Sequence, residues 1–383
     1  LVAEILVGET FVTYLGFKNL GLVDSFSVYA LKVNLIEGDA SACVLGGGHG
    51  DDVVGKAPGT CLLEARFNVE PYDNPDKVVY FRINVTAPPP TTVVTAKTFL
   101  PLVGFEWTEA RDANKDYFDL VQAIETWELG YTGEGSVVAI IDGGFEVTHP
   151  DFIDRIILEV CLSAENLDDK CPNGEDLAEG PGALYPPTKF SGTHGTGVAG
   201  VVHQFAPDAR FIFIEPMGGG GNMMGWTHLA YDWVLDNAQR YGIDALVMSY
   251  GENVSQREAL ITGEGCPDPD DENEKFAAMK ALGVVPIAAS GNDGFLESAG
   301  GTPGCYEDVA SVGWANQYGL VHMASNVDES LTMLAPAGLQ VAAAEIEDVG
   351  SYSPFAGTSG AAPVVGALIA IARQINPGAT ADE

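Results

Sequence analysis

The stretch Phe355-Ala356-Gly357-Thr358-Ser359-Gly360-Ala361-Ala362-Pro363 places one serine among small residues, directly before the apolar run 364–372. The small and apolar residues predict a buried helix, and Ser359 lies where a loop enters it. Backbone N–H groups at the start of a helix have no acceptor within the helix, so the hydroxyl and the N–H of Ser359 are both available to a bound group. The pattern predicts a nucleophilic serine, and the alternative is an ordinary Ser or Thr cap of a buried helix.

Length and charge set the broad class of the chain. Of its 383 residues 46% are hydrophobic and 19% charged, and no apolar run is long enough to cross a bilayer without interruption. We therefore expect two globular domains and no membrane span. The chain has 54 acidic and 18 basic residues, a net charge of −36, of which residues 1–95 carry −5. A field of this sign repels nucleic acid, which we exclude as a partner.

Six cysteines are spread along the chain, and none of them forms a C-x-x-C pair. This spacing argues against a zinc or thioredoxin-like motif and favours three disulfides formed in an oxidising compartment. About 15 pairings are open, and six buried thiols are the alternative. Pairing of sequence neighbours, which respects the domain division, joins Cys43 with Cys61, Cys161 with Cys171, and Cys266 with Cys305. The glycan acceptor pattern Asn84-Val85-Thr86 also favours an extracellular or cell-surface location.

The first 87 residues predict a small β-rich accessory domain. Short segments in which apolar and polar residues alternate are separated by Gly, Asp and Asn turns, as in strands. The expected strands are 2–7, 10–15, 26–36, 61–69 and 78–85. Residues 88–100, rich in Pro and Thr, predict a stiff linker, so the second domain spans 101–383. We assign no chemistry to the β-rich domain and expect it to anchor the protein or to bind an extracellular partner.

The second domain alternates apolar strands with helices, which predicts an α/β fold with a doubly wound, mostly parallel sheet. The expected strands are 137–141, 210–214, 244–248 and 284–289, and the expected helices are 116–129, 225–241 and 272–282. Polar or glycine-rich loops follow the strands. Ligands bind beyond the carboxyl ends of the strands in such sheets, so we expect these loops to form one site. For Asp142, after the first of these strands, the alternative is a cap of an ordinary turn.

Four motifs together resemble the subtilisin family of serine endopeptidases, known as subtilases or peptidase S8. They contain Asp142 in Ile-Asp-Gly-Gly, His194 in Gly-Thr-His-Gly-Thr, Asn292 in Ala-Ser-Gly-Asn, and Ser359 in Gly-Thr-Ser-Gly-Ala-Ala-Pro. The resemblance runs from about residue 123 to residue 372. It implies an Asp-His-Ser triad that hydrolyses peptide bonds through an acyl-enzyme, with no cofactor needed for the chemistry.

The implied roles fit the chemistry of the side chains. A serine hydroxyl needs a base as it attacks, and an imidazole with an unperturbed pKa of about 6.5 suits that task. His194 is then the base for Ser359, and Asp142 orients the imidazole. The tetrahedral intermediate carries charge on the former carbonyl oxygen, which the Asn292 amide and the Ser359 N–H bind.

The resemblance also implies where a substrate lies. Ser249-Tyr250-Gly251 and the run 218–221, which contains Gly219 and Gly220, flank an extended peptide that binds through its main chain. The first specificity pocket lies between Ser249–Gly251 and the loop that contains Gly291. A flexible turn is the alternative for the glycine run.

Some features depart from the family pattern. Gly197 and Gly360 stand where the family has histidine and methionine, outside the four chemical roles. Acidic residues gather in the insertions 161–187 and 263–274, where the resemblance implies a structural calcium ion and composition alone indicates solvated loops. The β-rich domain lacks the α/β pattern of a subtilisin propeptide. Thr380 to Glu383 match the start of a helix, so we expect the polypeptide to continue and the peptidase domain to be incomplete here.

Two hypotheses about function follow. The first is a secreted serine endopeptidase. The second is a catalytically silent subtilisin-like module that binds partners or serves structure in an extracellular assembly, which the additional β-rich domain would suit.

Overall fold

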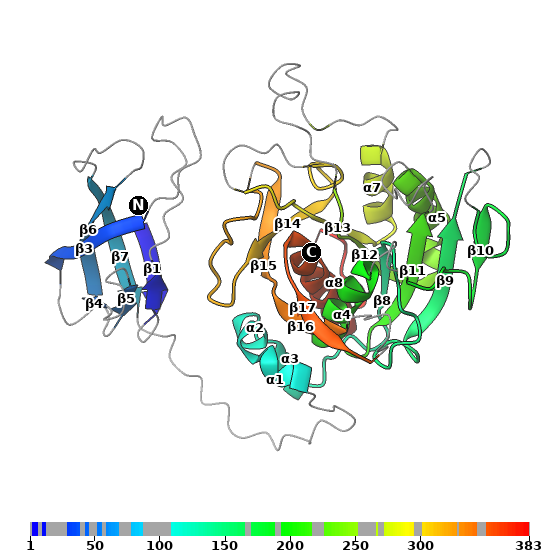
Figure 1. Ribbon diagram of the computed structural model, residues 1–383, viewed down its shortest axis with the longest axis horizontal. Helices are drawn as coiled ribbons and strands as arrows, with labels where there is room; N and C mark the ends of the chain where they lie inside the picture. The colour runs from blue at the N-terminus through cyan, green and yellow to red at the C-terminus, as the bar shows by residue number, and fades with distance from the viewer. Residues whose placement is uncertain are drawn as a thin grey trace. The chain divides into compact units, whose positions relative to one another are not determined.

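The chain forms two compact units, Leu1–Thr98 and Phe99–Glu383. A computed structural model describes seven strands within the first unit (Figure 1). In the second it describes residues 109–164, 170–187, 193–216, 226–251, 266, 272–294, 301–327, 329–342 and 350–382.

The strands of the first unit form two sheets. The larger has the order β1-β7-β6-β3 and consists of β1 (Val2–Leu6), β7 (Val78–Thr86), β6 (Gly59–Asn68) and β3 (Tyr29–Gly38). The smaller has the order β2-β5-β4 and consists of β2 (Thr10–Val12), β5 (Asp52–Gly55) and β4 (Cys43–Leu45). All five expected strands overlap strands of this unit, while β4 and β5 were not expected. The predicted Cys43–Cys61 disulfide and the glycan on Asn84 concern side chains outside the described ones.

An eight-stranded sheet of order β10-β9-β11-β8-β12-β13-β14-β15 forms the centre of the second unit. Its neighbouring strands run parallel except for β10, which pairs antiparallel with β9, and this confirms the predicted α/β class. The strands are β8 (Val137–Ile141), β9 (Ile156–Leu162), β10 (Leu177–Glu179), β11 (Arg210–Pro216), β12 (Ile243–Met248), β13 (Val285–Ala289), β14 (Ala310–Ala315) and β15 (Leu331–Pro336). A separate hairpin joins β16 (Leu339–Ala342) to β17 (Tyr352–Phe355).

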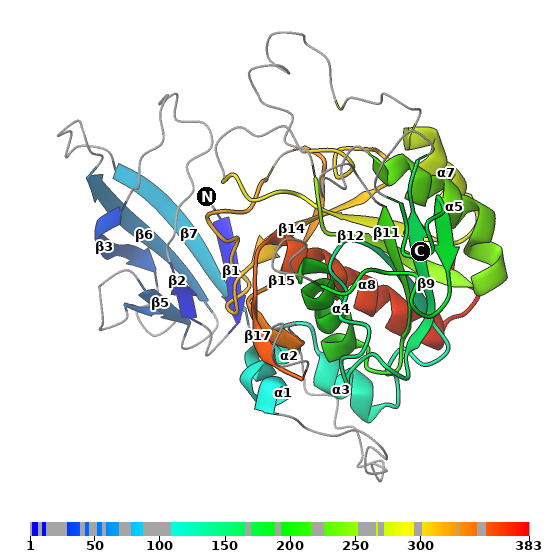
Figure 2. The same ribbon diagram turned by 45° about the vertical axis from the view of Figure 1, so that its right-hand side comes forward.

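Helices cover both faces of this sheet (Figures 1 and 2). The helices α4 (His194–Phe205) and α8 (Thr358–Ile375) lie side by side on one face. On the other face α5 (Thr227–Tyr241) and α7 (Glu272–Ala281) pack together. Alternate residues of a strand face opposite sides of a sheet, which is why β8 contributes Val138 and Ile140 to one core and its other residues to the second.

The expected helix 116–129 is wrong in one respect, because it is interrupted. The structure has α1 (Glu109–Ala113), α2 (Lys115–Leu120) and α3 (Ala123–Glu128) in this region. Gln122 separates α2 from α3 and has a positive φ of 58°, a left-handed conformation that cannot continue a right-handed helix. The break lets Phe118 and Trp127, on successive helices, pack edge to face with their ring centroids 4.9 Å apart.

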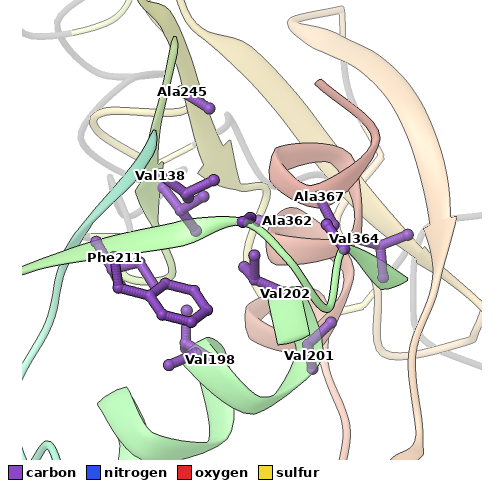
Figure 3. Close-up of a cluster of buried hydrophobic side chains, with 14 of the residues drawn as sticks. Val138, Val198, Val201, Val202, Phe211, Ala245, Ala362, Val364 and Ala367 are labelled. Atoms are coloured by element: carbon purple, nitrogen blue, oxygen red, sulfur yellow. The ribbon is translucent and has the colours of Figure 1, made fainter. Parts of the chain in front are cut away.

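Small side chains let α8 approach the sheet closely. Figure 3 shows Ala362, Val364 and Ala367 of this helix among side chains of α4 and the strands. Where α8 crosses β12, a Cβ atom on Gly366 would lie 2.5 Å from Cγ2 of Val247. Within the described ranges, α8 is the helix whose length and apolar composition would allow a membrane span, but 61% of it is buried inside the unit.

Two disulfides tie loops of the second unit together. They join Cys161 of β9 to Cys171, and Cys266 to Cys305, as sequence-neighbour pairing predicts. The first closes the loop between β9 and β10. The second links position 266 to the segment before β14.

We predict that Gly366→Ala destabilises the second unit, although alanine favours a helix by up to about 1 kcal/mol over glycine. The added methyl group overlaps Val247, and overpacking of a core costs about 1–3 kcal/mol. Urea unfolding of the Ser359→Ala protein, with and without Gly366→Ala, measures the effect. In a Val247→Ala background the same change should cost less, and an equal cost in both backgrounds would contradict the close contact.

Candidate active site

Asp142 lies at the carboxyl edge of the sheet, directly after β8. Its N–H donates to the Ile214 carbonyl of β11 at 3.1 Å, and the side chain is buried, with 2% of the residue exposed. The Gly143 N–H donates to Oδ1 of Asp142 at 2.7 Å. The strand end and the turn after it therefore fix this carboxylate.

His194 is the first residue of α4 and meets Asp142 there. Its Nδ1 lies 3.0 Å from Oδ1 and 2.9 Å from Oδ2 of Asp142. The Gly195 N–H donates to the Gly143 carbonyl at 2.9 Å, which ties the start of α4 to the turn after Asp142. A carboxylate on Nδ1 favours the tautomer that is protonated there and leaves Nε2 as an acceptor.

The charge of Asp142 changes the basicity of His194. Burial lowers the pKa of His194, but the charge and hydrogen bond of Asp142 outweigh burial, so that the pKa is raised above its usual 6.5. This imidazole therefore holds a proton more readily than an isolated histidine.

Ser359 is the second residue of α8 and is half-buried. Gly357, the residue before α8, has a φ of 86°, a backbone conformation that favours glycine. Pro363 has no N–H for the carbonyl of Ser359, four residues earlier in the helix. That carbonyl instead accepts a hydrogen bond from the Ser249 hydroxyl at 2.9 Å, and the Ser359 hydroxyl donates to the Ser249 carbonyl at 3.0 Å. The two serines are therefore joined by reciprocal hydrogen bonds.

Asn292 lies in the loop after β13, beside the start of α8. Its Oδ1 accepts from the backbone N–H of Thr358 at 2.9 Å and from the Thr358 hydroxyl at 3.1 Å. The same hydroxyl accepts from the Gly291 N–H at 3.2 Å. Because the amide oxygen is held on the helix side, the amide nitrogen is the part of the side chain that remains for a ligand.

A pocket of about 200 Å³ opens beside Ser359. The loops after β12 and β13 and the start of α8 form its wall, which consists of Ser249, Tyr250, Gly251, Ala289, Gly291, Asn292, Asp293, Thr358 and Ser359. The structure thus places the expected substrate-binding residues Ser249, Tyr250, Gly251 and Gly291 around one cavity. Gly219 and Gly220 lie outside the described residues.

Phe355 explains the glycines at positions 197 and 360. Its ring packs edge-on against the imidazole of His194, with ring centroids 5.2 Å apart. A Cβ atom on Gly197 would lie 2.5 Å from this ring, and one on Gly360 would lie 3.1 Å from Cβ of Ala337 and 3.2 Å from the Phe355 carbonyl oxygen. A side chain at position 197 would therefore displace the phenylalanine that packs on His194.

One contact that a triad needs is absent from this arrangement. Among the described residues, no hydrogen bond joins Ser359 to His194, because the hydroxyl of Ser359 points to Ser249 instead. The structure thus brings the Asp142–His194 pair to the same edge as the pocket that contains Ser359 and Asn292.

Sequence reasoning missed three residues that contact the site residues: Thr358 binds Asn292, Phe355 packs on His194, and Glu215 binds the turn after Asp142. Thr358 belongs to the motif of Ser359 and could have been found as its neighbour. Phe355 and Glu215 gave no signal, because their contacts with His194 and with the Asp142 turn arise from distant parts of the chain.

We predict that Asp142→Asn lowers the pKa of His194, because the imidazolium loses the charge and the hydrogen bond of the carboxylate. A proton bound more tightly in the folded state stabilises it below the unfolded pKa, and this contribution is lost as pH rises through the folded pKa. The stability difference between parent and variant should therefore be largest in acid. In a Ser359→Ala background, NMR titration measures the pKa of His194 and urea unfolding measures the stability difference. Asp119→Asn, at a surface carboxylate paired with Lys115, is the control. An unchanged His194 titration would contradict the pairing.

The chain is similar to known serine proteases. A family model described as "Subtilase family" matches residues 133–383. The chain is 27% identical over 275 residues to an intracellular serine protease of Paenibacillus polymyxa, covering 67% of this chain and 72% of that protein. It is 32% identical over 199 residues to the minor extracellular protease Vpr of Bacillus subtilis (strain 168), covering 50% of this chain and 22% of that protein.

A third relative is the halolysin-like extracellular serine protease Nep of Natrialba magadii, 26% identical over 271 residues, with 67% of this chain and 43% of that protein covered. The relatives thus include extracellular and intracellular proteases. Since the family model covers more than half of the chain, and the observed α/β fold agrees with it, the chain belongs to the subtilase family of serine endopeptidases.

Proposed function

We propose that this chain is a secreted endopeptidase that hydrolyses peptide bonds with Ser359 as nucleophile, His194 as general base and Asp142 as the partner of the imidazole. The observation that carries the proposal is the Asp142–His194 pair, at the edge of the sheet where Ser359 and Asn292 line a pocket. Membership of the subtilase family favours an active endopeptidase over a catalytically silent binding or structural module.

In the first step Ser359 Oγ attacks the carbonyl carbon of the scissile bond while His194 Nε2 accepts the hydroxyl proton. We infer that Ser359 first rotates about its Cα–Cβ bond, which breaks its hydrogen bond to the Ser249 carbonyl and turns the hydroxyl towards His194. Such a rotation between staggered positions needs no movement of the backbone.

The tetrahedral intermediate places a negative charge on the former carbonyl oxygen. The amide nitrogen of Asn292 and the N–H of Ser359, at the start of α8, are the donors for this oxygen. His194 then gives its proton to the leaving amine, and the C–N bond breaks. Water then attacks the acyl carbon and gives a proton to His194 Nε2. The ester C–O bond breaks as His194 passes that proton to Ser359 Oγ, which releases the carboxylic acid product.

Substrate binding is proposed to follow the sheet edge. The backbone of Ser249–Gly251 on one side of the pocket can pair with an extended peptide, main chain to main chain. Gly291, whose N–H and carbonyl already bind Thr358 and Asn326, forms part of the opposite wall. Such pairing demands little of the substrate sequence. Protein substrates agree with membership of the protease family.

Secretion is supported by the two disulfides and by the acidic composition. Disulfides persist in oxidising compartments, and a high net charge keeps a protein soluble. A structural calcium ion stays a prediction, because residues 165–169 and 267–271 of the acidic loops lie outside the described ranges. Among the described residues, no group of three or more His, Cys, Asp or Glu side chains gathers in a way that could hold a metal.

We predict that a fluorophosphonate forms a stoichiometric adduct on Ser359 of the native protein and that Ser359→Ala takes up none. The phosphonate reports an activated serine, since an ordinary serine hydroxyl does not react at neutral pH. Intact-mass measurement and casein cleavage test this. No adduct on folded protein, or equal cleavage of casein by Ser359→Ala, would defeat the proposal.

For Asn292→Ala we expect kcat to fall by about 10²–10³ with little change in KM, because the lost donor acts on charge that develops only in the transition state. Steady-state kinetics on a peptide amide measure kcat and KM separately. Asn237→Ala serves as the control, since that side chain binds only the Trp233 carbonyl of its own helix among its described partners. A rise in KM with kcat unchanged would assign Asn292 to ground-state binding instead.

A further inference from the structure

Glu215 lies beside Asp142 on the neighbouring strand. In the parallel pairing of β11 with β8, Ile214 is opposite Ile141, so the next residues, Glu215 and Asp142, are also opposite each other. Alternation along the strands directs both side chains to the face that α4 covers, where Phe213 and Ile140 lie. A second carboxyl group therefore adjoins the Asp142–His194 pair from the side of β11.

The surroundings of Glu215 are almost closed to water, with 7% of the residue exposed. Its Oε1 accepts a hydrogen bond from the Gly144 N–H at 3.4 Å, in the turn that follows Asp142. Its Oε2 is buried and has no hydrogen-bond partner within the described part of the chain. The side chain thus holds the Asp142 turn with one oxygen, and the other oxygen is left without compensation for the loss of water.

This environment keeps Glu215 protonated up to neutral pH. Burial raises the pKa of Glu215 and the charge of Asp142 adds to this effect, while the backbone N–H groups of Gly144 and Tyr185 lower the pKa, which leaves it at about 7. The group therefore changes charge in the range in which a histidine titrates.

The other charged groups near this position are already paired or lie on other strands. His194, at the start of α4, binds Asp142. Glu159 of β9 accepts from the Gly182 N–H at 2.9 Å. Lys170, whose carbonyl accepts from the Tyr185 hydroxyl, is paired with Asp176. Asp142 is the charged side chain that acts on the ionisation of Glu215.

We propose that Glu215 is a positioning residue for the Asp142–His194 pair: it holds the turn after Asp142 through Gly144, and its ionisation adds a negative charge beside Asp142. The idea rests on the proposed catalytic roles of that pair. Below neutral pH the neutral carboxyl leaves the pair undisturbed. Above neutral pH the added charge favours the imidazolium form of His194 and so moves its titration upward.

NMR titration of His194 in a Ser359→Ala background tests the electrostatic part without any need for activity. Glu215→Gln keeps an oxygen acceptor for Gly144 but cannot ionise, so the midpoint of His194 should move to lower pH by about half a unit or more. Glu159→Gln is the matched control, since Glu159 is an equally buried glutamate one strand further away, also 7% exposed. Equal midpoints in Glu215→Gln and the parent, or an equal shift in Glu159→Gln, would overturn the proposal.

Unfolding in urea between pH 4 and 8 gives a second measurement. A raised pKa means that the folded state binds the Glu215 proton more tightly than the unfolded state, so stability falls as pH rises from the usual 4.5 to about 7. This component of the fall should be absent from Glu215→Gln and present in Glu159→Gln. An identical pH dependence of parent and Glu215→Gln would show that Glu215 does not titrate there.

Kinetics test the positioning part. We expect Glu215→Ala to lower kcat about tenfold at pH 8.5 with KM unchanged, because the turn after Asp142 loses the hydrogen bond to Glu215. The Glu215→Gln variant should keep most of the parent kcat, since its amide oxygen can still accept from Gly144. Equal kcat values in Glu215→Ala and the parent would refute the positioning role. If the native chain cleaves no substrate, the proposed function fails, while the titration and unfolding results still decide whether Glu215 acts on His194.

Discussion

Close packing of α4 and α8 on one face of the parallel sheet is the constraint on which the site depends. Both helices begin at the carboxyl edge of the sheet, where His194 is the first residue of α4 and Ser359 is the second residue of α8. Glycine and alanine make this approach feasible: a Cβ atom on Gly195 would lie 2.7 Å from the ring of Phe145, and one on Gly366 would lie 2.5 Å from Val247. Larger residues would push the helices outward and move His194 away from Ser359.

Backbone hydrogen bonds then fix each side chain where its helix or strand ends. The turn after Asp142 is bound to β11 by the carboxyl of Glu215 and to α4 by Gly195. The start of α8 is bound to β12 through the two serines and to β13 through Thr358 and Asn292. A network that is fixed before substrate arrives stabilises charge in the transition state without further reorganisation.

Sequence predicted the parallel sheet, its central strands and the motif residues at its edge, because continuous apolar runs followed by glycine and a polar residue are distinctive. It did not predict β15, whose residues Thr332, Met333 and Leu334 are exposed and lack the apolar pattern of a buried strand. Nor did it single out Glu215, since Ile-Glu-Pro gives no sign that the carboxyl group contacts the turn after Asp142. Strand register and the bond from Ser359 to Ser249 are long-range properties that local patterns do not contain.

We propose that one rotation of the Ser359 hydroxyl completes a site whose other parts are already in place. A crystal structure of the protein with a peptidyl phosphonate bound to Ser359 tests it most directly. The account predicts the phosphonyl oxygen within hydrogen-bonding distance of the Asn292 amide nitrogen and the Ser359 N–H, with His194 still bound to Asp142 through Nδ1. A phosphonyl oxygen that meets neither donor, or an imidazole that has left Asp142, would contradict the account.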